Sequence, residues 1–258
     1  MSAFSVTTLG IGSAMSAQGR HPSAQLLQAQ GHLYLIDCGE GTQERLWQAG
    51  IDPNRIQRVL IGHLHGDHFF GLLGVMSTMH LLGRTKELHI HAPGELHAII
   101  EMQLRASRTY LRYHYTFHPH PEGSGVELFV DPHVRATTLE LDHRIPTTGF
   151  VFEQTERPLR LRTDQLDRIP HYARTGVTQG EDLRLPDGSV VPNAELTLPR
   201  IPPLRYAYCT DSTPVPGNAP FLHGVDLMYH DATFGSELLA RAKETKHSTA
   251  AQAAALAA

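Results

Sequence analysis

The chain has 258 residues, of which 41% are hydrophobic and 19% are charged, a composition typical of an ordinary soluble globular protein. No apolar stretch approaches the roughly 18 residues that a membrane span requires, and the N-terminus has neither the basic region nor the apolar core of a secretory signal. The net charge of −4 does not favour nucleic acid as a general partner, so a local patch or a metal centre would have to attract one.

Two residue types in the composition carry information about compartment and chemistry. The chain has two cysteines, Cys38 and Cys209, and their wide separation fits a reducing cytoplasm better than a disulfide framework. The 18 histidines are an unusually high number, and they make metal chemistry the first hypothesis to consider.

The apolar pattern predicts strands and helices that alternate along the first 110 residues. Strands are expected at 4–13, 23–29, 32–39, 57–63 and 86–93, with a hairpin turn at Gln30 and Gly31 between the second and the third. Helices are expected at 39–50, 67–83 and 94–108, where apolar residues recur at helical spacing. The strand at 57–63 has a continuous apolar run, which is typical of a central buried strand.

The second half of the chain predicts a second set of strands and an insertion. Strand-like pieces fill 113–152, whereas about 153–200 is rich in Arg, Asp, Pro and Gly and reads as an inserted arm. Strands return at 204–211 and 226–234, and the tail is expected to be a helix with a capping box between Thr249 and Gln252. This order predicts one α/β domain over 1–258, built as a sandwich of mixed sheets.

The segment "HLHGDH" places four candidate metal ligands directly after the predicted central strand. Burying so many polar groups is costly unless each finds a partner, and a cation would supply one. Gly66 allows a tight turn, so that His63 and His65 face one point while Asp67 and His68 face another. Imidazole and carboxylate ligands suit zinc, and less specifically manganese or iron. The alternative is a polar loop whose histidines only satisfy hydrogen bonds.

Two metals need more ligands than this loop supplies, and two further polar residues also follow apolar runs. His143 in "LDHRIPTTGF" and Asp211 in "CTDSTP" both fit this description. A carboxylate such as Asp211 can bridge two cations roughly 3.5–4 Å apart, as in two-metal hydrolases. Taken alone, His143 reads equally well as a packed strand residue and Asp211 as a turn former.

Together these motifs resemble the ribonuclease Z family of the metallo-β-lactamase superfamily, whose members mature the 3′ ends of tRNA. "HLHGDH" matches the superfamily's H-x-H-x-D-H signature, and the specific companion is "DCGEGTQ" upstream of it. "LGIGSA", "LDHRIPTTGF", "CTDSTP", "HDATF" and "KHSTAAQAA" follow the same order, from about Phe4 to the last residue. The resemblance implies an αββα sandwich and a homodimer in which the arm of one subunit holds precursor tRNA over the site of the other.

The resemblance also implies a role for each site residue. His63, His65 and His143 would hold one zinc, Asp67 and His68 would hold a second, and Asp211 would bridge them. Asp67 would also accept a proton from the attacking water. The 3′ trailer would be removed with a 3′-hydroxyl left on the tRNA and a 5′-phosphate on the trailer.

Three more residues receive supporting roles from the same resemblance. Asp37 would brace the ligand loop, although capping of the next turn is an equal and compatible reading. His247 would protonate the leaving 3′-oxygen with Asp231 orienting it, whereas the plain alternative for His247 is a residue that precedes a helix N-cap.

The sequence departs from the family pattern at three places. The family carries another ligand histidine after the "HST" helix; because this chain ends at Ala258, we expect the last strand and helix to be missing and the second metal site to be weakened. "HEAT" is replaced by "HDAT", so Asp231 is one methylene shorter than the glutamate. The arm has no Gly-Pro motif, and its arginines could contact phosphate or belong to a mixed-charge surface: Arg157, Arg160, Arg162, Arg168 and Arg174.

Three hypotheses follow from this reading. The first is a zinc-dependent endoribonuclease that acts on precursor tRNA. The second is another phosphodiesterase of the same fold, acting on a small diester. The third is a metal-binding but catalytically idle form, or an RNA-binding module.

Overall fold

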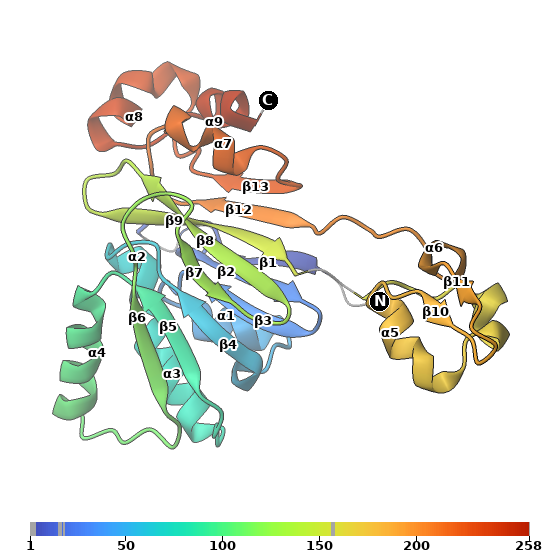
Figure 1. Ribbon diagram of the computed structural model, residues 1–258. Coiled ribbons are helices and arrows are strands. Elements are labelled where there is room, and N and C mark those ends of the chain that lie inside the picture. Colours follow the sequence, from blue (N-terminus) through green and yellow to red (C-terminus); the bar gives the residue numbers. More distant parts are fainter. Residues whose placement is uncertain (1–3, 15–16, 18, 156–157, 258) are drawn as a thin grey trace. The chain divides into compact units, whose positions relative to one another are not determined.

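Figure 1 shows the computed structural model of the chain, which describes residues 4–14, 17, 19–155 and 158–257. Contacts between residues divide it into two compact units. The main unit comprises Met1–Gln154 and Leu204–Ala258, and the arm unit comprises Thr155–Pro203. Arg157 of the predicted arm lies outside the described residues.

The first sheet of the main unit has six strands in the described part of the chain, in the order β1-β2-β3-β4-β5-β6. Pairing is antiparallel from β1 to β3 and parallel from β3 to β6. Its strands are β1 (Phe4–Gly10), β2 (Ala24–Ala29), β3 (His32–Ile36), β4 (Ile56–Leu60), β5 (Leu88–Ala92) and β6 (Tyr115–Pro119). Because β3 to β6 run parallel, the loops that leave their carboxyl ends meet at one edge of the sheet.

The second sheet has five strands among the described residues, in the order β13-β12-β9-β8-β7. Only β12 and β13 pair in parallel there; the other described pairs are antiparallel. The strands are β7 (Glu127–Val130), β8 (Val134–Leu141), β9 (Thr147–Gln154), β12 (Arg205–Cys209) and β13 (Leu227–His230). Both sheets are therefore mixed, as the sequence predicted.

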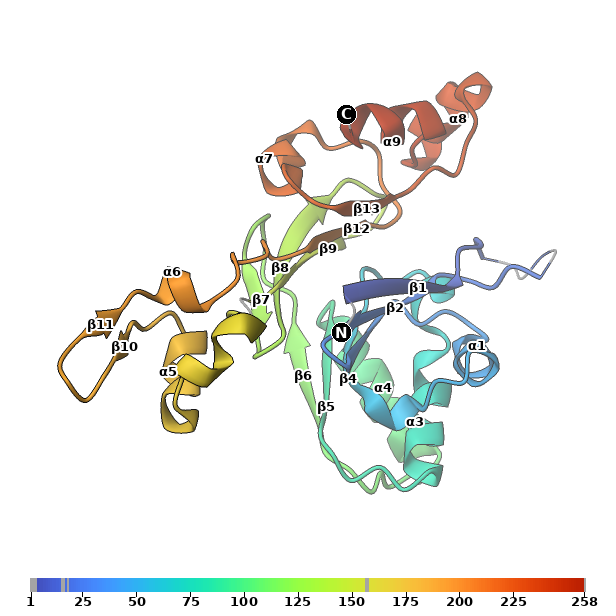
Figure 2. The same cartoon turned by 90° about the vertical axis from the view of Figure 1, so that its right-hand side faces the viewer.

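Helices cover the outer face of each sheet, which Figure 2 shows most clearly. The first sheet carries α1 (Thr42–Gln48), α3 (Leu72–Leu81) and α4 (Glu95–Ala106), and the second carries α7 (Ala219–Leu222), α8 (Leu239–Thr245) and α9 (Ala250–Ala257). The capping box at the start of α9 is confirmed: Gln252 N–H donates to Thr249 Oγ1 at 3.3 Å, and Gln252 Oε1 accepts from Thr249 N–H at 2.9 Å.

The period-two alternation of the strands explains why three apolar layers form. In β3, Leu33 and Leu35 pack under the helices of the first sheet, whereas Tyr34 and Ile36 face the second sheet. In β12, Tyr208 joins the layer between the sheets and Ala207 the layer beneath the C-terminal helices. The result is the four-layer αββα sandwich that the family resemblance implied.

The single helix predicted over 67–83 is wrong in one respect, because the chain breaks it into α2 (Gly66–Phe69) and α3. Gly71 lies at the break, and its N–H donates to Cys38 O at 2.8 Å. A Cβ at position 71 would lie 2.1 Å from Gly39 O, so no larger residue fits without movement of one backbone or the other. This close approach joins the ligand loop to the end of β3, which the helical periodicity could not indicate.

The arm unit has a small apolar core of its own and little regular structure. Its elements are α5 (Arg174–Thr178), β10 (Leu183–Arg184), β11 (Val190–Val191), α6 (Asn193–Leu196) and short 3-10 turns at Thr163–Arg168 and His171–Ala173. The core consists of Ile169, Val177, Leu183, Val191 and Leu196. In the whole described part of the chain, no helix has the length and apolar character needed to cross a bilayer.

Candidate metal centre

The predicted ligands follow the ends of β4, β8 and β12 within the main unit, on the connecting loops and, for Asp67 and His68, in the short helix α2. Among the described residues they form three overlapping groups, in each of which the ligand atoms lie within 4.8 Å of one another: His63, His65, His143 and Asp211; Asp67, His68 and Asp211; and Asp211, Asp231 and His247. Residues from five separate parts of the chain therefore converge on one place. Asp211 belongs to all three groups, as a bridging carboxylate would.

In the first group, three imidazole nitrogens face one another. His65 Nδ1 lies 3.1 Å from His63 Nε2 and 3.2 Å from His143 Nε2. His143 Nδ1 is 2.8 Å from Lys246 O and can donate its proton only to that carbonyl, which leaves Nε2 unprotonated as a ligand must be. Burial is the largest cause of the lowered pKa of all three rings, and it brings the pKa of His63 to about 2.

This group fits a cation better than it fits a hydrogen-bonded cluster. Three neutral rings have too few protons to satisfy three nitrogens that all point inward. Tetrahedral zinc with ligand distances near 2.0–2.1 Å would hold its nitrogens about 3.3 Å apart, and the observed separations of 3.1 and 3.2 Å are close to this value. The donor set of imidazoles and carboxylate is also the set that zinc prefers.

The second group is built around His68, which is buried. Its Nε2 makes no hydrogen bond with any described residue, and it lies 3.7 Å from Asp67 Oδ2 and 3.6 Å from Asp211 Oδ2. Burial lowers the pKa of His68, but the charges of Asp37 and Asp211 outweigh burial and raise the pKa to about 10. A buried nitrogen that lacks a partner and faces two carboxylates is suited to a second cation.

Asp37 braces the ligand loop from the end of β3. It is fully buried, with Oδ1 accepting from Gly62 N–H at 2.7 Å and Oδ2 accepting from Tyr208 O–H at 2.6 Å. Its Oδ2 also lies 2.7 Å from His68 Nδ1, which directs Nε2 of that ring toward Asp67 and Asp211. The backbone of Asp37 has φ 54°, a conformation that aspartate tolerates better than most residues.

Asp231 and His247 form a pair beside the ligands. Asp231 Oδ2 lies 2.7 Å from His247 Nδ1 and accepts weaker bonds from Ser212 N–H and Ser248 N–H, both at 3.2 Å. Its Oδ1 accepts from the Thr233 hydroxyl at 2.6 Å. The bond to Asp231 is the largest influence on His247 and raises its pKa, against the effect of burial.

An open cavity of about 570 Å³ lies over these groups. Its lining includes His65, Asp67, Asp211, Asp231 and His247. Arg144 and residues 11–14 line it as well. Proton-transfer candidates and cation ligands thus face one space that a substrate can enter. Asp67 is on this surface, whereas His63 and His68 lie beneath it.

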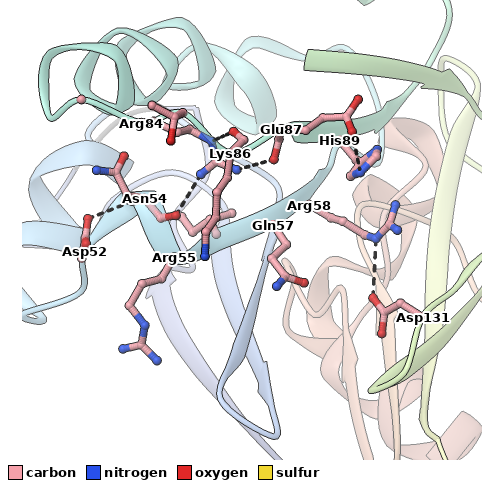
Figure 3. Close-up of a pocket in the computed structure, with 13 residues that line it drawn as sticks. Asp52, Asn54, Arg55, Gln57, Arg58, Arg84, Lys86, Glu87, His89 and Asp131 are labelled. Atoms are coloured by element: carbon pink, nitrogen blue, oxygen red, sulfur yellow. Dashed lines mark hydrogen bonds and ion pairs between the residues drawn. The ribbon is translucent and has the colours of Figure 1, made fainter. Parts of the chain in front are cut away.

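A second cavity of about 480 Å³, shown in Figure 3, is lined by several cations, and two of its arginines are engaged within the protein. Arg84 donates to the carbonyls of Asn54, Lys86 and Glu87. Arg58 Nε lies 3.6 Å from Asp131 Oδ2, and the Arg58 guanidinium stacks over the ring of Phe129. This cavity contains none of the proposed metal ligands or proton donors, several of which line the other cavity.

The reason for Gly66 differs from the sequence interpretation. Its φ is not positive, so the turn itself does not demand glycine. A Cβ at this position would instead lie 2.2 Å from the ring of Phe70, which packs against the start of α2.

Sequence reasoning missed three contributors to the site: Tyr208, Thr233 and the carbonyl of Lys246. Tyr208 could have been suspected, because alternation in "YAYCTD" places it on the inner face near the strand end. The carbonyl of Lys246 could not, because a backbone oxygen carries no signal in the side-chain pattern. Lys246 adopts φ 55°, and this left-handed residue closes α8.

Comparison with known proteins identifies the family. The chain is 41% identical to the ribonuclease Z of Bacteroides fragilis over 259 aligned positions, which cover 100% of this chain and 85% of that protein. The chain belongs to the ribonuclease Z family. Residues 4–164 also match the family model described as anti-Pycsar protein Apyc1, and the chain belongs to that family as well.

Solved structures agree with this family assignment. The crystal structure of human tRNase Z, short form, superposes with a TM-score of 0.74 at 28% identity, covering 98% of this chain and 86% of that one. The metallo-β-lactamase-fold protein YhfI from Bacillus subtilis gives a TM-score of 0.63 at 19% identity, covering 98% and 80%, and shares the fold. The predicted αββα fold class is thus confirmed for this ribonuclease Z family member.

Proposed function

We propose that this protein is a zinc-dependent endoribonuclease that removes the 3′ trailer of precursor tRNA. The observation that carries the proposal is the 41% identity to a ribonuclease Z across the whole chain. The convergence of three imidazoles and Asp211 in the main unit supports it, because phosphodiester hydrolysis by two metals needs such a ligand set.

The residues proposed to hold the metals are those that the sequence indicated. His63, His65 and His143 would bind one zinc, Asp67 and His68 the other, with Asp211 shared between them. A zinc pair held there would activate water as a nucleophile near neutral pH and offset the negative charge that develops on the phosphate.

The other steps are assigned to side chains of the chain itself. Asp67 lines the cavity and would accept the proton of the attacking water. His247 would protonate the leaving 3′-oxygen, and Asp231 keeps the proton of Nδ1 engaged so that Nε2 is the nitrogen left for the substrate. The products would be tRNA with a 3′-hydroxyl and a trailer with a 5′-phosphate.

We also propose a cytoplasmic homodimer. Cys38 and Cys209 are both buried and unpaired, in keeping with a reducing compartment. Large apolar side chains are exposed at the C-terminal ends of α1 and α3 in the main unit: Trp47, Leu81 and Leu82, exposed by 80%, 79% and 51%. A second copy would cover such a surface. Sedimentation of the protein and of its Trp47→Lys variant tests this, since the variant should shift toward monomer.

The test of the main proposal is a cleavage assay. The zinc-loaded protein is incubated with a precursor tRNA that carries a 3′ trailer, and both product ends are mapped. We expect one cut near the discriminator base with the end groups given above. Absence of cleavage near that base, with metal bound, would exclude the proposed function.

A second candidate is a phosphodiesterase for a different diester. It is favoured by the match of residues 4–164 to a family model whose description is not ribonuclease Z. Turnover of a small diester far above that of tRNA would support it over the first candidate. A catalytically idle form is distinguished by metal analysis, because about two zincs per chain with activity excludes it.

A further inference from the structure

Arg144 is a cation at the mouth of the candidate active site to which neither the sequence nor the comparisons assign a role. It follows His143 directly and is exposed on the surface of the 570 Å³ cavity. Among the described residues that line this cavity, Arg144 is the sole lysine or arginine. A guanidinium cannot ligate a cation, because it has donors and no lone pair to offer.

Arg144 makes no hydrogen bond or ion pair with any described residue, and the carboxylates around it already have partners. Asp142, two positions away, lies 2.6 Å from Lys246 Nζ and accepts from the Thr213 hydroxyl at 2.9 Å. Asp231 is engaged with His247, as described above. The charge of Arg144 is therefore left for a group that comes from outside the protein.

Arg144 faces the same cavity as the groups proposed to act in the reaction. His65, Asp67 and His247 line that cavity with it, and Arg144 directly follows the proposed ligand His143 in the chain. A group that enters the cavity can therefore meet the guanidinium, the proposed metal ligands and the proposed proton donor together.

We propose that Arg144 binds the phosphate of the RNA strand at the cleavage position, and this inference rests on the proposed nuclease function. Its planar guanidinium can donate two parallel hydrogen bonds to non-bridging phosphate oxygens. A phosphate held by this contact would share the cavity with the ligand cluster and His247. Among the described residues that line the cavity, no other lysine or arginine is available for such a paired contact.

The experiment compares Arg144→Ala and Arg144→Lys with the unaltered zinc-loaded protein on a trailer-bearing precursor tRNA. We expect kcat/KM to fall about ten- to hundredfold for Arg144→Ala, the range for loss of a charge-assisted contact. The slope of log affinity against log salt should also become shallower by about 0.7–1, because one phosphate contact is lost. Arg144→Lys should keep the slope but lose part of kcat/KM, since it keeps the charge and not the paired donors.

A second readout does not depend on turnover. The dissociation constant of the zinc-loaded protein is measured over a salt series for the same RNA with its leaving 3′-oxygen replaced by a methylene group, so that the strand stays intact. The matched control is Arg135→Ala, an exposed arginine on β8 that pairs with Glu127 away from the cavity. Thermal melting and zinc content are recorded for every variant, and Arg144→Gln replaces Arg144→Ala if the latter does not fold.

The results separate this inference from the proposed function. If the unaltered protein cleaves precursor tRNA and Arg144→Ala matches Arg135→Ala in both kcat/KM and salt slope, the phosphate role of Arg144 is wrong. Equal losses in Arg144→Ala and Arg144→Lys with an unchanged slope and lowered zinc content would show a structural role and overturn it too. If RNA binding depends on Arg144 but no cut occurs near the discriminator base, the inference survives and the proposed function fails.

Discussion

Asp231 Oδ2 lies 2.7 Å from His247 Nδ1, although residue 231 is one methylene shorter than the glutamate in the family's motif. The shorter side chain reaches because Ser212 N–H, Ser248 N–H and the Thr233 hydroxyl fix the carboxylate in place. The pair therefore keeps the geometry of a positioned proton donor.

Removal of His247, the proposed proton donor, should affect substrates differently according to their leaving groups. We expect His247→Ala to lower kcat on precursor tRNA by about 10²–10⁴-fold, the usual contribution of general acid catalysis. Hydrolysis of a bis-nitrophenyl phosphate diester should change far less, because nitrophenolate leaves without protonation. His114→Ala, on an exposed ring remote from the cavity, serves as the control. Equal losses on both substrates would contradict a role in protonation.

The pH dependence of kcat should report the same pair. The carboxylate of Asp231 raises the pKa of His247, so the protonated ring persists to higher pH than it would alone. Activity on tRNA should thus fall on the alkaline side as this proton is lost. Asp231→Asn should move that fall to lower pH, as measured in a pH–rate profile. An alkaline limb at the same pH in both proteins would argue against His247 as the acid.

Asp37 should control metal affinity without touching a metal. Asp37→Ala removes the acceptor for Gly62 N–H, the Tyr208 hydroxyl and His68 Nδ1, so that ring is free to rotate. We expect zinc affinity to fall about 10–100-fold, measured by competition with a chromophoric chelator. Tyr208→Phe, which removes one of the three bonds, should lie between this variant and the unaltered protein. Unchanged affinity in both variants would refute the bracing role.

Gly71 should be intolerant of the smallest side chain. A Cβ there lies 2.1 Å from Gly39 O, so Gly71→Ala should lower the free energy of unfolding by about 1–3 kcal/mol, as overpacking does. Gly217→Ala is the matched control, because its Cβ would have no neighbour within 4 Å and its φ is not positive. Chemical denaturation of both variants is the measurement, and a similar midpoint for both would count against the close-approach argument.

Acid should destabilise the sandwich through His91, which is buried on β5. Burial, together with His118 and Arg58, lowers its pKa to about 2, so the ring stays neutral in the folded protein. In the unfolded chain the pKa of this histidine is roughly 6.5, so below that pH the unfolded chain binds a proton that the folded protein does not. The contribution of His91 to stability is therefore complete above that pH and is lost as the pH falls.

The size of this effect can be measured by denaturation at several pH values. Over pH 6 to 4, His91 should contribute a loss of about 1.4 kcal/mol per pH unit. His91→Gln should make the dependence on pH shallower by that amount, whereas His114→Gln on the exposed surface should not. An unaltered slope in His91→Gln would show that other groups govern acid unfolding.

Most of the fold follows from local patterns in the sequence. The hairpin at Gln30, the strands β3 and β12 and the capping box at Thr249 all depend on residues close in the chain, and each is found as predicted. The break at Gly71 and the helix α8 were missed. The break depends on the backbone of Gly39, 32 residues upstream. Helix α8 has too few apolar residues to show a helical periodicity.

The site residues also differ in whether the local sequence could indicate them. The loop ligands His63, His65 and His68 could be proposed together because their spacing is local. The contributions of Tyr208 and Lys246 depend on long-range packing. The Tyr208 hydroxyl donates to Asp37, 171 residues away in the chain, and the Lys246 carbonyl accepts from His143, 103 residues away. Motif spacing therefore indicates the ligands but not the groups that orient them.

One peptide bond joins the two halves of the proposed chemistry. The carbonyl of Lys246 holds the ring of His143, and the next residue, His247, is held by Asp231. Any displacement of residues 246 and 247 would change both the orientation of His143 and the position of His247. A substitution that moves this backbone should therefore affect metal binding and proton transfer together. The contact with His143 needs only a main-chain oxygen in a left-handed turn, so glycine or asparagine at position 246 should preserve it. The lysine side chain takes no part in that contact and bonds to Asp142 instead.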